Sequence, residues 1–98
     1  MPLTTGQFKE SLQSPSPPAG SSELLQALWY DANGDWAKAH GIAQDVDTRD
    51  GSWVHAYLHR KEGDASNAQY WYNRAQKPFS KTSLEHEWED IVENLLQR

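Results

Sequence analysis

The chain has 98 residues and a formal net charge of -5, and it contains no cysteine. The absence of cysteine excludes a disulfide framework, a thiolate zinc site and a cysteine nucleophile. Lysine and arginine are scattered instead of forming a basic stripe, so we expect no nucleic-acid partner. Because no apolar run approaches the length of a membrane span, we also expect no membrane partner and a cytoplasmic location.

The core of this chain is predicted to be aromatic. Only 37% of the residues are hydrophobic, yet the chain contains five Trp and four Tyr. Each buried Trp or Tyr removes about 150–250 Å² from water, so a few rings can replace many aliphatic side chains. The length allows a single domain.

The N-terminal 20 residues are polar and contain Pro15, Pro17 and Pro18. Proline fixes φ and donates no backbone hydrogen bond within a helix. Residues 1–20 are therefore predicted to form a flexible tail, with at most one helical turn around Phe8 and Leu12.

Two helical hairpins are predicted next, over residues 21–47 and 51–77. In the first, Ser21 or Ser22 begins a helix that ends at Asn33-Gly34, and a second helix begins near Asp35. Apolar residues recur at three- and four-residue spacing: Leu24, Leu25, Leu28, Trp29, Trp36, Ala39, Ile42, Ala43 and Val46.

The second hairpin follows the same plan. Ser52 is expected to open its first helix and Gly63 to end it, Asp64 or Ser66 to start the next, and Pro78 to close the pair.

A C-terminal helix is predicted over residues 82–97. Thr82-Ser83-Leu84-Glu85 is typical of a capping box with Thr82 as the cap, and an amphipathic pattern follows. We expect this helix to cover an open end of the hairpin array or to pair two chains, which predicts a monomer or a homodimer formed through this helix. Its apolar residues are Leu84, Trp88, Ile91, Val92, Leu95 and Leu96.

An internal repeat supports the two hairpins, because Gly63-Asp64 stands 29 positions after Gly34-Asp35 and aligns Ala56 with Ala27. A small residue where helices cross lets two backbones approach, and Gly favours the left-handed cap between them. The sequence therefore predicts an all-α fold of two stacked hairpins.

The segment AYLHRKEGDASNAQYWYNRAQKP resembles the second half of a tetratricopeptide repeat, and its HRKEGD and YWY block is similar to one in small bacterial proteins. The resemblance covers roughly residues 22–78 and implies a TPR-like or Sel1-like right-handed array, although the repeat is shorter than the usual 34 residues. The first copy departs from the pattern at Ala43 and Val46. The matching positions are Gly63, Asp64, Ala68, Tyr72, Ala75 and Pro78.

No nucleophile with a nearby base and no phosphate-binding glycine loop occurs in the sequence, so we expect neither an enzyme nor a cofactor. The function expected first is a non-catalytic interaction or scaffold module for a protein or peptide. Aromatic side chains favour interfaces and nearby arginines can receive an anion. The candidate binding residues are Trp53, Tyr57, Arg60, Tyr70, Trp71 and Arg74.

His55 and His59 are four residues apart on a predicted helix, as two helical zinc ligands are. A third ligand would have to come from His40, His86 or a carboxylate such as Glu62. Ala56 occupies the place where the helical zinc motif has Glu, so we assign no metal site from sequence. The alternative function is a small-molecule or metal-binding protein or enzyme that uses these histidines with aromatic pocket walls, and convergence of the imidazoles in space would favour it.

Overall fold

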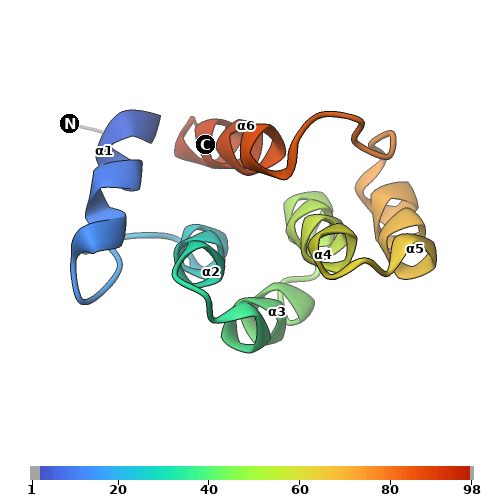
Figure 1. The fold of residues 1–98 in the computed structure, drawn as a ribbon, viewed down its shortest axis with the longest axis horizontal. Coiled ribbons are helices and arrows are strands. Elements are labelled where there is room, and N and C mark those ends of the chain that lie inside the picture. Colours follow the sequence, from blue (N-terminus) through green and yellow to red (C-terminus); the bar gives the residue numbers. More distant parts are fainter. Residues whose placement is uncertain (1–2, 98) are drawn as a thin grey trace.

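The computed structural model describes residues 3–97 and is helical without strands over that range (Figure 1). The expected all-α class is confirmed. The elements are α1 (Thr5–Glu10), the 3-10 turn η1 (Ser11–Gln13), α2 (Glu23–Ala32), α3 (Trp36–Gln44), α4 (Arg49–Glu62), α5 (Ala65–Ala75) and α6 (Leu84–Leu96).

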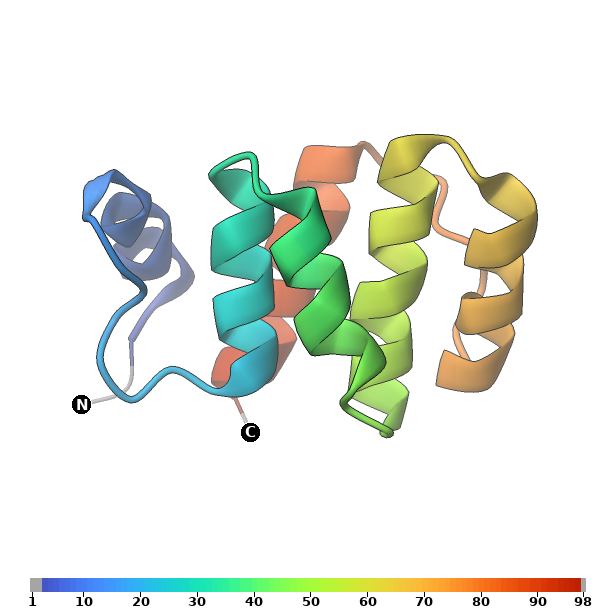
Figure 2. The same ribbon diagram turned by 90° about the horizontal axis from the view of Figure 1, so that it is seen from below.

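The four central helices lie side by side in chain order, as Figure 2 shows. α2 packs on α3, α3 on α4 and α4 on α5, and short turns join consecutive helices. α6 lies along α2 and α4, on the side opposite α3 (Figure 1). It therefore spans both helix pairs instead of covering one end of the array.

The start of α4 differs from the prediction. Thr48, not Ser52, caps the helix, and its hydroxyl accepts a hydrogen bond from the backbone N–H of Gly51 at 3.0 Å. A Cβ at Gly51 would lie 2.0 Å from the carbonyl oxygen of Val46. The chain therefore turns tightly before this glycine, and the helix begins at Arg49, one turn earlier than the hydrophobic pattern indicates.

The caps of the other helices are short polar side chains. Ser22, Asp35 and Asp64 cap α2, α3 and α5, in agreement with the sequence pattern. At α6 the cap is Ser83 instead of Thr82, and its hydroxyl accepts from the backbone N–H of His86. The shift by one residue places Leu84 at the first helical position.

The N-terminal segment contains more structure than the expected tail. Phe8 of α1 is 0% exposed, and its ring lies 5.9 Å from that of Trp88 on α6. The indole Nε1 of Trp29 donates to the carbonyl oxygen of Ser11 at 3.1 Å. Burial of a large ring stabilises by roughly 1.5–3 kcal/mol, which explains why α1 packs although the prolines end it soon afterwards.

A buried carboxylate attaches α6 to the second helix pair. Glu87 is 2% exposed and accepts hydrogen bonds from the hydroxyl of Tyr72 at 2.6 Å and from the indole of Trp53 at 3.1 Å. The Arg60 guanidinium lies 2.8 Å from the same carboxylate and also donates to the carbonyl oxygen of Thr82. Every oxygen of the buried acid thus has a partner, as burial of a charge requires.

The apolar face of α6 packs against other helices of the same chain. Trp88, Ile91 and Leu95 are buried against the rest of the domain.

Among the helices that the structure describes, none is long and apolar enough to cross a membrane.

Candidate metal centre

Three histidines meet where α3 packs on α4. His55 and His59 are four residues apart in α4, so the helix places both imidazoles on one face. α3 runs back along that face and contributes His40 from the middle of the helix. Two neighbouring elements therefore supply three imidazoles to one place.

The ring nitrogens are close enough to share one ion. The Nε2 atoms of His40 and His55 lie 3.0 Å apart, and one ring nitrogen from each of the three histidines lies within 4.8 Å of the others. A tetrahedral ion with metal–nitrogen bonds of about 2.0–2.1 Å holds its ligands roughly 3.3 Å apart. The His40–His55 separation is close to this value, and the separations to His59 are at most 4.8 Å.

Two tryptophans flank the histidines. Trp71 of α5 stacks on His55 with ring centroids 3.9 Å apart, and Trp36 of α3 stacks on His40 at 4.8 Å. The indole of Trp36 donates to the carbonyl oxygen of Leu58 at 2.8 Å, which holds the ring in place. The indoles therefore form two sides of the site.

Burial lowers the pKa values of two of the three imidazoles. His55 is 4% exposed, and its desolvation, helped by the nearby His40 and His59, lowers its pKa to about 4. Burial also lowers the pKa of the partly exposed His40. Neutral imidazole is the form that binds metal, so His40 and His55 require no deprotonation near pH 7.

A carboxylate lies beside the histidines. Glu62 Oε1 is 3.3 Å from Nδ1 of His59, and Asp64 lies within 4.8 Å of both groups. A carboxylate on the outer nitrogen of a ligating histidine orients the ring and favours one tautomer.

Internal hydrogen bonds satisfy the cluster only in part. His40 and His55 share one contact, whereas Nδ1 of His55 is buried without a hydrogen-bond partner among the described residues. A buried ring nitrogen without a partner costs about 1–3 kcal/mol, and an ion bound through Nε2 of His55 would leave this Nδ1 without a partner as well.

The structure selects one of the third ligands considered from sequence. His40 joins His55 and His59, and Glu62 lies next to them. His86 is exposed on α6, where its Nε2 lies 3.5 Å from Asp90 Oδ2. The spacing of His55 and His59 is visible in the sequence, but the place of His40 depends on how α3 packs against α4.

Three of the six candidate binding residues lie on the side of α4 that faces α6. Trp53 and Arg60 contact Glu87, and the hydroxyl of Tyr57 donates to the buried Asp31 at 3.2 Å. These side chains bond to carboxylates of the interior.

The other three lie together on α5. Tyr70 is 52% exposed, and its hydroxyl accepts from Arg74 Nη1 at 3.2 Å. The Arg74 guanidinium also lies 5.2 Å from the ring of Trp71, and this indole stacks on His55. The six candidate binding residues thus form two separate groups, one on α4 facing α6 and one on α5.

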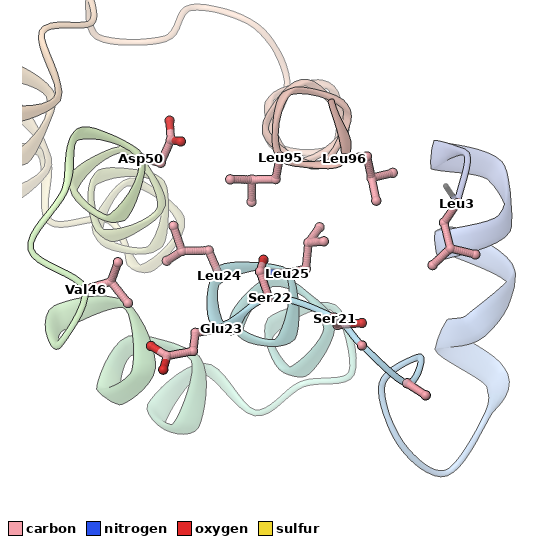
Figure 3. Close-up of a pocket in the computed structure, with 12 residues that line it drawn as sticks. Leu3, Ser21, Ser22, Glu23, Leu24, Leu25, Val46, Asp50, Leu95 and Leu96 are labelled. Carbon is pink, nitrogen blue, oxygen red and sulfur yellow. The ribbon is translucent and has the colours of Figure 1, made fainter. Parts of the chain in front are cut away.

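Another cavity lies elsewhere in the domain. It has a volume of about 620 Å³ and opens between the N-terminus of α2 and the C-terminus of α6 (Figure 3). Leu24, Leu25 and Leu95 form its apolar walls, and Glu23 lies at its edge. No metal-ligating cluster of the described residues lies in this cavity.

Comparison with models of protein families, with curated proteins and with solved structures gave no match for this chain.

Proposed function

We propose that this domain binds one divalent transition-metal ion through His40, His55 and His59. The observation that carries the proposal is the convergence of three imidazole nitrogens within 4.8 Å at the α3–α4 contact. Imidazole suits zinc, copper, iron and nickel, and a chain without cysteine has no thiolate to offer.

The arrangement has the parts that a metal site needs beyond its ligands. Glu62 contacts Nδ1 of His59, and the indoles of Trp36 and Trp71 stack on His40 and His55. The interaction-module role is a weaker candidate, because its six residues do not form one surface.

Calorimetric titration of chelator-treated protein with zinc(II) tests the proposal. We expect one ion per chain and a rise in melting temperature, because an ion that binds only the folded state stabilises it. His40→Gln and His59→Gln are expected to weaken binding at least tenfold, since each removes one of three ligands.

His86→Gln is the matched control, because His86 is an exposed histidine on α6. Circular dichroism verifies that each variant keeps its helix content. Zinc binding that is absent, or that His86→Gln weakens as much as His40→Gln does, would contradict the proposal.

A further inference from the structure

The histidine cluster supplies fewer ligands than a closed metal site. Structural zinc sites have four protein ligands, whereas sites with three leave a position for water or substrate. The described residues within reach that could provide a fourth ligand are the acids beside His59, namely Glu62 and Asp64. Whether the site is open depends on what these carboxylates do.

Glu62 is placed to orient His59, and it does not need to bind the metal itself. Its Oε1 lies 3.3 Å from Nδ1 of His59, the distance of a weak hydrogen bond from the ring N–H. While that contact is kept, Glu62 holds the ring and stays outside the coordination shell. Asp64 caps α5 by accepting from the backbone N–H of Asn67, so its carboxylate already has a structural role.

We propose that the metal site, on whose existence this inference rests, is open and takes a small monocarboxylate as its fourth ligand. Histidine binds metal as neutral imidazole, so three such ligands leave the full charge of a divalent ion uncompensated. A carboxylate oxygen is a usual fourth ligand for zinc at about 2.0–2.2 Å.

Access and charge favour a small, singly charged anion. His40, on α3, is the partly exposed member of the cluster, so the cluster is nearest to solvent at this residue. The carboxylates of Glu62 and Asp64 lie next to His59 and repel a doubly charged anion such as phosphate more strongly than a singly charged one. The indoles of Trp36 and Trp71 limit the space on two sides.

Cobalt(II) provides a direct probe, because its visible absorption responds to a change of ligand. Protein loaded with one cobalt(II) ion per chain would be titrated with sodium acetate at constant ionic strength, with perchlorate as the balancing anion. We expect a saturable change in the visible spectrum and a smaller change with inorganic phosphate. An unchanged spectrum in excess acetate, or tighter binding of phosphate than of acetate, would overturn the proposal.

Glu62→Gln separates the two roles of this residue. If Glu62 positions His59, the variant binds cobalt about 10–100-fold more weakly and keeps its response to acetate. If Glu62 is instead the fourth ligand, the parent protein does not respond to acetate and the variant does, which would overturn the open site.

The failures of the two proposals are distinguishable. Absence of cobalt and zinc binding would overturn the metal site and the open position together. Stoichiometric cobalt whose spectrum ignores acetate would overturn the open position only.

Discussion

The Nε2 atoms of His40 and His55 lie 3.0 Å apart across the contact between α3 and α4. With His59 one turn further along α4, this pair forms a cluster of three imidazoles between two indoles. The low pKa of His55 and the packing of α3 on α4 both depend on this contact.

The stability of the metal-free protein is expected to fall as the pH is lowered from about 6.5 to about 4. The pKa of His55 is about 4 in the folded state and roughly 6.5 in an unfolded chain, so the unfolded state binds its proton first. The loss is at most about 3 kcal/mol at about 1.4 kcal/mol per pKa unit. Urea denaturation in the presence of chelator measures it, and His55→Gln is expected to reduce the dependence in this range.

Trp71→Ala is expected to raise the pKa of His55 toward its ordinary value. Burial is the main cause of the low pKa, and the indole of Trp71 covers the imidazole at 3.9 Å. The titration of the histidine ring protons, followed by NMR with chelator present, measures the change. Tyr70→Ala removes an exposed neighbouring ring and serves as the control; equal shifts in both variants would argue against the role of Trp71.

Glu87→Ala is expected to destabilise the domain by about 3 kcal/mol. The variant leaves Arg60 without its buried partner and removes the acceptor of Tyr72 and Trp53. Chemical denaturation measures the loss. Glu93→Ala changes an exposed carboxylate on the same helix and should have little effect.

Phe8→Ala tests whether the N-terminal segment is part of the folded domain. The ring is fully buried against Trp88, so its removal is expected to cost about 3 kcal/mol and to alter tryptophan fluorescence. Leu12→Ala changes a half-buried side chain and should cost less. A variant at Phe8 that denatures like the parent would indicate the flexible tail that the prolines suggested.

Two glycines are expected to respond in opposite directions. Gly63 ends α4 with φ at 91°, so Gly63→Val is expected to destabilise by more than about 1 kcal/mol. Gly41 lies inside α3 with open space around it, and Gly41→Ala is expected to stabilise by about 0.5–1 kcal/mol. Thermal denaturation of both variants measures the difference.

The sequence alone determined the helices and most of their ends, because these depend on local chemistry. Ser22, Asp35 and Asp64 act as caps within three residues of the amides they bond, and Gly63 takes a left-handed conformation that its own lack of Cβ permits. The same local geometry placed His55 and His59 on one face of α4.

Only the tertiary structure decided what these elements do together. A tight turn before Gly51 moves the start of α4 to Arg49, and a partner on α6 holds Phe8 in the core. His40 reaches His55 because α3 packs back along α4, a relation between residues 15 positions apart that depends on packing between helices. Helical periodicity places side chains around one helix, whereas the meeting of faces from two helices is set by the burial of the whole core.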